Sequence, residues 1–216
     1  MLTVHHLNFS RSFRILWLLE ELQLPYELVR YERDASFRAP ASLKAVHPLG
    51  KAPIVQDDEL TLAESASILS YLDRKYGGAR LSPPEGTPEA AIHDEWLHYV
   101  ESSAAFPIMM TVIGKMMGGL PEGLGKFSEP EVAKTFAYIA DAVGEGPYLM
   151  GAKLTLADIQ MSYLLATAES AGLLKDQPVV SAYFERLKAV PGYQNSIEIG
   201  GPLAPPRRRS CRLSVP

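Results

Sequence analysis

The chain is poor in the residues that hold metals or form disulfides. It has a single cysteine, Cys211, which excludes an internal disulfide framework and any Cys-x-x-Cys redox or zinc site. Its five histidines are His5, His6, His47, His93 and His98. They show neither His-x-x-x-His spacing nor paired carboxylates, so we expect no metal site.

Long apolar runs and excess basic charge are also absent. The longest apolar tract, near residues 108–120, is interrupted by Lys115 and by the pair Gly118–Gly119, and it is too short to span a bilayer. The N-terminus lacks the basic and apolar regions of a secretory signal. A net charge of −4 argues against a nucleic-acid-binding surface spread over the molecule. We therefore expect a cytoplasmic protein that binds neither membranes nor nucleic acid.

What is present is typical of a globular protein with a full core. Hydrophobic residues make up 47% of the 216 positions, enough for two small domains or one large one. The first 76 residues predict a strand at 2–7, a helix after Ser10, a strand at 26–31 and a short helix at 40–46. A hairpin at 53–63 and a helix from Glu64 follow. The predicted order of this domain, residues 1–76, is βαβαββα.

The second half reads as helical. Residues 77–88 are rich in Gly and Pro and predict a linker. Residues 88–117 predict one long helix or two helices broken near Pro107, and further helices are expected at 129–143, 155–171 and 179–189. Thr155 and Asp158 have the spacing of a capping box. We expect an all-α domain at residues 89–195 and a Pro/Arg-rich tail at 196–216, which contains Cys211.

Ser10 lies between a predicted strand and a predicted helix, and its position has two interpretations. As a helix cap, its oxygen accepts a backbone N–H and stabilises the helix by about 1 kcal/mol. As a functional group, its hydroxyl lies beside the positive end of the helix dipole and donates to a bound anion such as a thiolate. No Gly-x-Ser-x-Gly elbow surrounds it, which argues against a Ser-His-Asp hydrolase.

Two dipeptides in the hairpin region also have two interpretations. Pro53 after Ala52 is either an ordinary trans proline at a strand start or a cis peptide, with the Ala52 backbone paired to a peptide-like ligand. Glu64 and Ser65 either complement a helix start or bind a zwitterion, with Ser65 on its carboxylate and Glu64 on its ammonium.

Two further features suit the binding of a small molecule. Lys51 and Arg38 would neutralise a second carboxylate at the other end of such a zwitterion. The methionine-rich stretch 106–117 is most simply core, but it also suits an adaptable apolar binding wall.

Taken together, four motifs resemble the cytosolic glutathione transferase family over about residues 2–195. They are SRSFRILWLLEEL from Ser10, HPLGKAPIV from His47, LAESASILSYL from Leu62 and LTLADI from Leu154. The run RDASFRAP at residues 33–40 resembles the microbial branch that contains the yeast-type enzymes. Four motifs in the same order and spacing are far more specific than any one of them.

The resemblance implies a thioredoxin-like N-terminal domain that binds glutathione and an all-helical C-terminal domain that binds a hydrophobic electrophile. Ser10 would be the catalytic hydroxyl that stabilises the glutathione thiolate. The expected glutathione-binding residues are Ser10, Arg38, Lys51, Ala52, Pro53, Glu64 and Ser65, with Pro53 cis. The expected electrophile-binding residues are Phe9, Phe106, Met110 and Ile113. The family is commonly a homodimer that acts in detoxification.

Several alternatives stay open at this point. Ser12 or Arg11 would serve as the thiolate partner in place of Ser10. The same thiolate would also support a glutathione-dependent peroxidase, isomerase or dehalogenase. A non-catalytic ligand-binding protein on the same fold is the remaining possibility, although it need not retain Ser10, Lys51 and Glu64 together.

Overall fold

The computed structural model describes residues 1–204, and its N-terminal domain is built on one four-stranded mixed sheet with strand order β2-β1-β3-β4. Its elements in chain order are β1 (Leu2–Leu7), α1 (Phe13–Leu22), β2 (Glu27–Tyr31), α2 (Ser42–Val46), β3 (Ile54–Asp57), β4 (Leu60–Ala63) and α3 (Ser65–Tyr76). This is the predicted βαβαββα order, in a thioredoxin-like arrangement.

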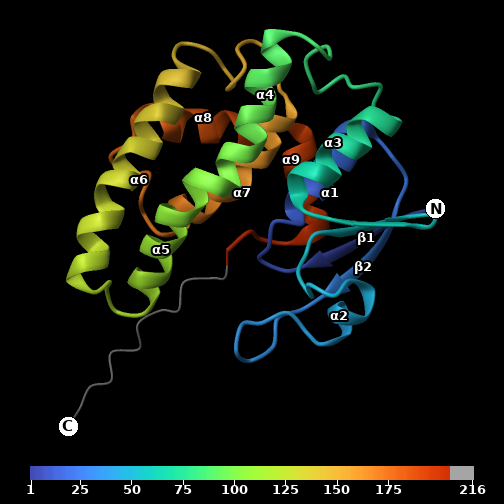
Figure 1. Ribbon diagram of the computed structural model, residues 1–216, viewed down its shortest axis with the longest axis horizontal. Helices are drawn as coiled ribbons and strands as arrows, with labels where there is room; N and C mark the ends of the chain where they lie inside the picture. The colour runs from blue at the N-terminus through green and yellow to red at the C-terminus, as the bar shows by residue number, and fades with distance from the viewer. Residues whose placement is uncertain (205–216) are drawn as a thin grey trace.

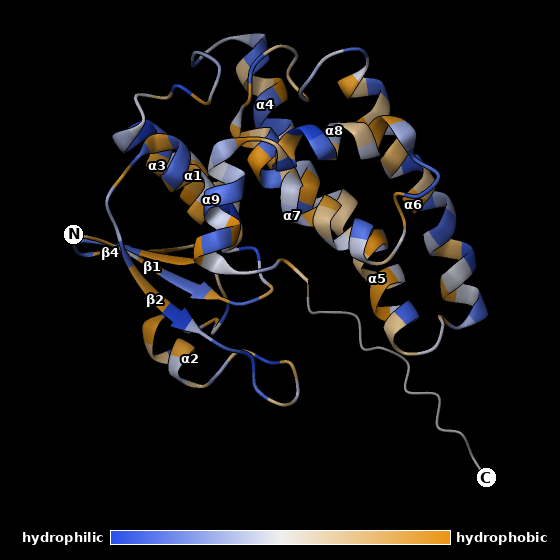
Figure 2. Cartoon of the chain, turned by 180° about the vertical axis from the view of Figure 1, so that it is seen from behind, coloured by the Kyte–Doolittle hydropathy of each residue, from blue (hydrophilic) through white to orange (hydrophobic). Residues whose placement is uncertain are grey.

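The pairing of the strands explains the order. β1 and β2 are parallel, so the chain must cross over between them, and α1 provides the crossover. β3 pairs with β1 and β4 in antiparallel register, and Asp58 in the hairpin turn has a φ of 52°, a left-handed conformation that aspartate tolerates. α1 and α3 cover one face of the sheet, and α2 lies on the other (Figures 1 and 2).

The C-terminal domain is helical. Its elements are α4 (Pro88–Tyr99), a π-helical segment (Val100–Ala104), α5 (Ala105–Met116), α6 (Glu122–Val143), α7 (Leu156–Ser170), α8 (Pro178–Lys188) and α9 (Pro191–Gly200). In the described residues no helix is both long enough and apolar enough to cross a membrane. α6 begins earlier than the predicted residue 129 and runs through Pro130.

The expected break near Pro107 takes a different form. The helix widens into the π-helical segment Val100–Ala104 and then continues through Pro107 as α5. Pro107 has no N–H to donate to the preceding turn, and a local π-turn is one way in which a helix accommodates such a gap. This wider turn becomes important for the site.

The predicted capping box begins α7, and its Asp158 also accepts hydrogen bonds from residues outside the box. Oδ2 of the buried Asp158 accepts from the backbone N–H and the hydroxyl of Thr155, at 2.8 and 3.0 Å. Its Oδ1 accepts from the Leu149 N–H and from the Tyr183 hydroxyl, at 2.9 and 2.7 Å. One carboxylate therefore joins the start of α7 to the preceding loop and to α8.

The helix ends near the expected domain boundaries are as follows. α4 begins at Pro88, inside the predicted linker, and the linker is anchored because the Leu156 N–H donates to the Leu81 carbonyl. α9 runs to Gly200, past the expected domain end at residue 195. Much of the predicted tail, including Cys211, lies outside the described residues.

α9 returns to the N-terminal domain and packs on α1 (Figures 1 and 2). The ring of Tyr193 meets Phe13 and Trp17 edge-on, with centroid distances of 4.9 and 5.1 Å. All three aromatic side chains are buried, so the contact stabilises both the helix pair and the interface of the two domains. It also brings the end of α9 beside β1.

Candidate functional site

Ser10 lies in the turn between β1 and α1. The helix begins at Phe13 with Ser12 at the N-cap position, so Ser10 is not the cap of α1. Its Oγ accepts the Ser12 N–H at 3.2 Å and lies 2.7 Å from Ser12 Oγ. Ser10 keeps 6% of its surface accessible, whereas Ser12 keeps none. Of the two serines, only Ser10 keeps any accessible surface.

Ser12 is committed to the interior. Its Oγ lies 2.9 Å from Nδ1 of His6, accepts the Leu7 N–H at 3.2 Å and lies 3.3 Å from the Leu7 carbonyl oxygen. A hydroxyl with these partners and no accessible surface has neither the room nor the free capacity to hold a thiolate. This geometry argues against Ser12 as the thiolate partner.

Arg11 is paired with Glu101 of the π-helical segment. Its Nε lies 2.8 Å from both carboxylate oxygens, and Nη1 of Arg14 lies 2.6 Å from Oε1. Burial by itself raises the pKa of Glu101, but the charge of Arg14 and the hydrogen bonds from Arg11 outweigh it and hold that pKa below its usual value. Glu101 is therefore an anion that joins the two domains.

Arg14 also orients Ser65. The same Nη1 donates to Ser65 Oγ at 2.9 Å, and Arg14 has no accessible surface. Because guanidinium only donates, Ser65 Oγ must accept, and its own hydrogen is directed to another group. Ser65 is the first residue of α3, where backbone N–H groups are also unpaired. The start of α3 is thus arranged to receive an anion.

Glu64 precedes Ser65 with an unusual backbone. It is exposed, and its φ of 71° and ψ of 117° lie outside the regions that non-glycine residues ordinarily adopt. Such conformations persist where the surrounding structure enforces them, and they cluster at binding sites. The predicted pair therefore lies together at one helix start, with the carboxylate of Glu64 in solvent beside the oriented hydroxyl of Ser65.

Tyr163 of α7 closes the back of the site. Its ring lies under both guanidinium groups, 5.4 Å from that of Arg11 and 5.7 Å from that of Arg14. Its hydroxyl donates to the Phe9 carbonyl at 3.1 Å. Nε and Nη2 of Arg14 have no hydrogen-bond partner within residues 1–204, so the aromatic face compensates part of its buried charge.

The loop that carries Arg38 is fixed to the turn that carries Ser10. Arg33 donates to the carbonyls of Asn8, Phe9 and Phe37 at 3.0–3.2 Å. The rings of Phe9 and Phe37 stack at 6.0 Å. Arg38 itself is exposed.

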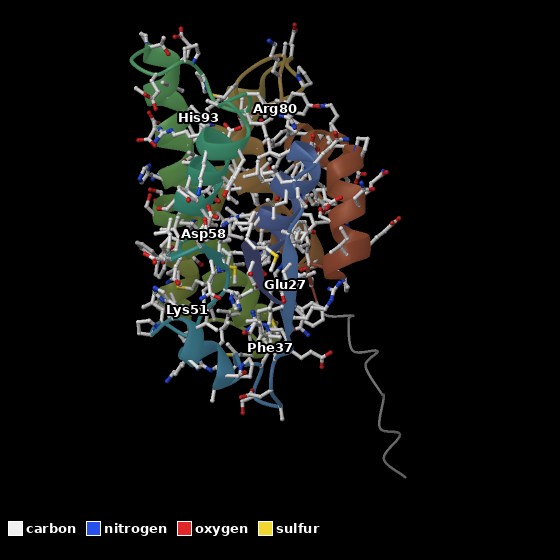
Figure 3. All side chains as sticks on the ribbon, turned by 90° about the vertical axis from the view of Figure 1, so that its right-hand side faces the viewer. Glu27, Phe37, Lys51, Asp58, Arg80 and His93 are labelled. Carbon is white, nitrogen blue, oxygen red and sulfur yellow. The ribbon has the colours of Figure 1, made fainter. Side chains whose placement is uncertain are left out.

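Lys51, Ala52 and Pro53 lie at the entry to β3. The Ala52–Pro53 peptide is cis, as expected, and Lys51 is exposed. Figure 3 places Lys51 and Phe37 at the same end of the N-terminal domain, opposite Arg80 and His93. The two expected cations, Lys51 and Arg38, therefore come from neighbouring loops at one end of the domain.

The predicted apolar wall lies on one stripe of α5. Hydrogen bonds of a π-turn join residues five apart, so Phe106 follows Glu101 on the same side of the helix. Met110 and Ile113 continue the stripe at helical spacing. Phe106 and Ile113 are 60% and 48% exposed, which is costly in water without a ligand or partner. Since Glu101 contacts Arg11, the stripe starts at the junction of the domains.

Outside this region, the part of the chain that the structure describes has a hollow between two helices but no metal-binding cluster. Residues 1–204 contain no cluster of three or more His, Cys, Asp or Glu side chains that would hold a metal. A hollow of about 580 Å³ lies between α3 and α4, lined by polar residues that include Ser67, Ser70, Arg74 and Asp94. Ser10 does not line it.

Sequence reasoning missed Arg14, Glu101 and Tyr163. Arg14 reads as one polar position in an amphipathic helix, and its only local signal is that it falls among residues that all prove to be buried. Glu101 and Tyr163 are far from it in sequence, and nothing local points to their pairing.

Comparison with known proteins supports the fold described above. Residues 2–74 match the family described as glutathione S-transferase, N-terminal domain, and residues 113–195 match glutathione S-transferase, C-terminal domain. Glutathione S-transferase 1 of Saccharomyces cerevisiae is 34% identical over 92% of this chain and 94% of its own. Glutathione S-transferase 3 of Schizosaccharomyces pombe is 34% identical over 78% of this chain and 75% of its own.

A solved structure agrees as well. The crystal structure of a glutathione S-transferase from Actinobacillus pleuropneumoniae has a TM-score of 0.84 and 30% identity, and the match covers 94% of both chains. With the yeast relative similar along nearly its whole length, the chain belongs to the glutathione S-transferase family.

Proposed function

We propose that in this glutathione transferase the Ser10 hydroxyl donates a hydrogen bond to the thiolate of bound glutathione. The thiolate then attacks an electrophilic carbon of a small apolar compound. The observation that carries the proposal is the arrangement of two hydroxyls at two helix starts. Ser10 keeps some accessible surface whereas Ser12 keeps none, and the Ser65 hydroxyl accepts from Arg14, which leaves its own hydrogen for another group.

The energy required of Ser10 is modest. A free thiol has a pKa of about 8.5, so only a small fraction is ionised at neutral pH. Lowering the pKa by about two units makes most of it thiolate and requires less than ~3 kcal/mol of differential stabilisation. One hydroxyl donor and the positive end of α1 are sufficient for that.

Glutathione has a zwitterionic γ-glutamyl end, and Glu64 with Ser65 matches it. The Ser65 hydroxyl and the free N–H groups of α3 suit the carboxylate, and the exposed Glu64 suits the ammonium. In this arrangement the Glu64 carboxylate would meet the ammonium of the ligand, and the positive N-terminal end of α3 would meet its carboxylate.

The rest of the tripeptide would extend towards α2. The Ala52 backbone beside Pro53 would pair with the cysteinyl backbone in the manner of an added strand. Lys51 and Arg38, both exposed, would face the glycine carboxylate.

The electrophile would lie against the α5 stripe of Phe106, Met110 and Ile113, with Phe9 on the opposite side. These residues supply apolar area without hydrogen-bonding groups, so they favour apolar compounds of varied shape. A role in detoxification within the cytoplasm is consistent with such a site.

We further propose that two copies pair along the face of α3 and α4. The hollow between these helices lies on the same helix as Ser65, so a second copy there would border the glutathione site. Analytical ultracentrifugation tests this: a dimer is expected, and a monomer at all concentrations would contradict it.

The test of the function is a steady-state assay with glutathione and an activated aryl halide, followed by the absorbance of the conjugate. Wild-type protein is expected to form the conjugate, and Ser10→Ala to lose most of kcat while glutathione affinity stays within about tenfold. An organic hydroperoxide is the comparison substrate. Turnover of the hydroperoxide alone would replace conjugation with peroxidase activity, and glutathione binding without turnover of either would indicate a ligand-binding protein.

A further inference from the structure

A chain of short contacts runs from Ser10 into the core. Ser10 Oγ lies 2.7 Å from Ser12 Oγ, which lies 2.9 Å from Nδ1 of His6. Nε2 of the same ring lies 2.9 Å from the Gly200 carbonyl oxygen. All three distances are those of hydrogen bonds. The chain is buried, and it joins β1, the start of α1 and the last residue of α9.

The carbonyl of Gly200 sets the tautomer of His6. A carbonyl oxygen only accepts, so Nε2 of His6 must carry a hydrogen. In the neutral ring Nδ1 then has a free lone pair and accepts the hydroxyl hydrogen of Ser12. Burial lowers the pKa of His6 and the charge of Arg30 on β2 adds to this, while the Gly200 carbonyl opposes them, so the resting ring is neutral.

The direction of the remaining bonds follows from that of the first. The single Ser12 hydroxyl hydrogen has two acceptors in reach, Nδ1 of His6 at 2.9 Å and the Leu7 carbonyl at 3.3 Å, and the shorter contact is to His6. With that hydrogen donated to His6, Ser12 Oγ accepts from the Leu7 N–H and from the Ser10 hydroxyl. Ser10 Oγ then accepts the Ser12 N–H and keeps a lone pair for one more donor. A thiol that binds next to Ser10 would donate its hydrogen to that lone pair.

We propose that His6 is the acceptor of the glutathione thiol proton, through Ser12 and Ser10. The inference rests on the proposed function of Ser10. The S–H bond breaks as its proton moves to Ser10 Oγ, the Ser10 proton moves to Ser12 Oγ, and the Ser12 proton moves to His6 Nδ1. The products are a thiolate held by the Ser10 hydroxyl and an imidazolium at His6.

The count of hydrogens supports this direction. With the thiol bound, three hydrogens serve three contacts: sulfur to Ser10, Ser10 to Ser12, and Ser12 to His6. After the shift three hydrogens still serve the same contacts, and Nε2 still donates to the Gly200 carbonyl. If the proton left for water instead, two hydrogens would remain for three contacts, and a pair of oxygen or nitrogen lone pairs would face each other at 2.7 or 2.9 Å.

His5 provides a matched control because it is adjacent to His6 but lies on the opposite face of β1. Its Nδ1 lies 2.9 Å from the Tyr31 hydroxyl and its Nε2 lies 2.8 Å from Gln56 Oε1. Its ring is therefore part of a different set of hydrogen bonds and has no path to Ser10. Successive residues of a strand face opposite sides of the sheet, which separates the two histidines.

The experiment measures thiolate and released protons together in wild type, His6→Asn and His5→Asn. Thiolate is followed by its ultraviolet band on titration with glutathione, and proton release by calorimetry in two buffers of different ionisation enthalpy. Asparagine can accept the Ser12 hydrogen bond but has no basic nitrogen. We expect His6→Asn to release about one proton per thiolate and to have a thiol pKa higher by about one unit, whereas wild type and His5→Asn release measurably fewer protons per thiolate.

Release of about one proton per thiolate by wild type would overturn the relay. A His6→Asn variant with the same proton release and the same thiol pKa as wild type would overturn it as well. The number of protons that the wild-type protein releases per thiolate tests the relay even if His6→Asn does not fold. Failure of the proposed function has a different signature, since glutathione would then bind without any thiolate band in wild type.

Discussion

Nη1 of Arg14 lies 2.9 Å from Ser65 Oγ and is at the same time 2.6 Å from Oε1 of Glu101. One nitrogen of α1 therefore connects the start of α3 with a carboxylate of the C-terminal domain. The direction of the Ser65 hydroxyl depends on this connection, so the packing of the two domains and the proposed binding of the γ-glutamyl carboxylate are physically linked.

Arg14→Met should weaken glutathione binding without unfolding the protein. Methionine fills a similar volume, and Glu101 keeps its pairing with Arg11, so no buried charge is left alone. The Ser65 hydroxyl loses its fixed direction, and we expect about a tenfold higher Kd for glutathione by calorimetry. Lys134→Met, at an exposed cation on α6, is the control. Unchanged affinity in a folded Arg14→Met variant would show that Arg14 serves structure alone.

Ser65→Ala and Glu64→Ala should each raise the Kd for glutathione, by roughly tenfold, and leave kcat nearly unchanged. Both residues would bind a part of glutathione that does not react, so their contacts are the same in ground and transition states. Ser181→Ala, on α8 of the C-terminal domain, is the matched control. Wild-type affinity in both variants would remove the proposed γ-glutamyl site.

Phe106→Ala should raise KM for an apolar aryl halide and leave KM for glutathione unchanged. The side chain is 60% exposed, so its truncation leaves no cavity in the core. A contribution of about 1–2 kcal/mol to binding predicts a 5–30-fold loss in kcat/KM for the halide. Phe127→Ala on α6, also exposed, controls for general loss of surface hydrophobicity. Equal effects of the two changes would place the electrophile elsewhere.

Asp57 provides a prediction about pH. Burial opposes its charge, but hydrogen bonds from Lys75, Tyr71 and Tyr76 outweigh burial and lower its pKa to about 2. Since this pKa is below the ordinary 3.8, the carboxylate stabilises the fold above pH 4, and that contribution is lost as pH falls towards 2.

The corresponding change is Asp57→Asn. We expect it to lower the free energy of unfolding by about 1–3 kcal/mol at pH 7 and to flatten its decline between about pH 4 and 2, measured by denaturant titration. Asp58→Asn, at an exposed neighbour, is the control. An acid profile of Asp57→Asn parallel to that of wild type would contradict this role.

Sequence periodicity predicted the strands and most helices because local patterns determine them. The hairpin predicted at 53–63 and the capping box at Thr155 were confirmed, and the Ala52–Pro53 peptide is cis as the family resemblance implied. The π-helical segment was missed because it depends on how a helix passes Pro107, and α9 was missed because its apolar face is set by packing on α1.

The candidate site was predicted in part, for the same physical reason. Ser10, Glu64 and Ser65 stand at element starts that sequence can locate. Arg14 and Glu101 are 87 residues apart, and only the folded chain brings their charges together. The choice between Ser10 and Ser12 also needed burial, since both are serines in the same turn.

The most direct test of the central claim is the ultraviolet difference spectrum of bound glutathione against pH, with wild type beside Ser10→Ala. We expect a thiolate band in wild type that titrates about two units below the free thiol, and a midpoint in Ser10→Ala that is higher by at least ~1 unit. A band with the same midpoint in both proteins would contradict thiolate stabilisation by Ser10 and would direct attention to Arg11.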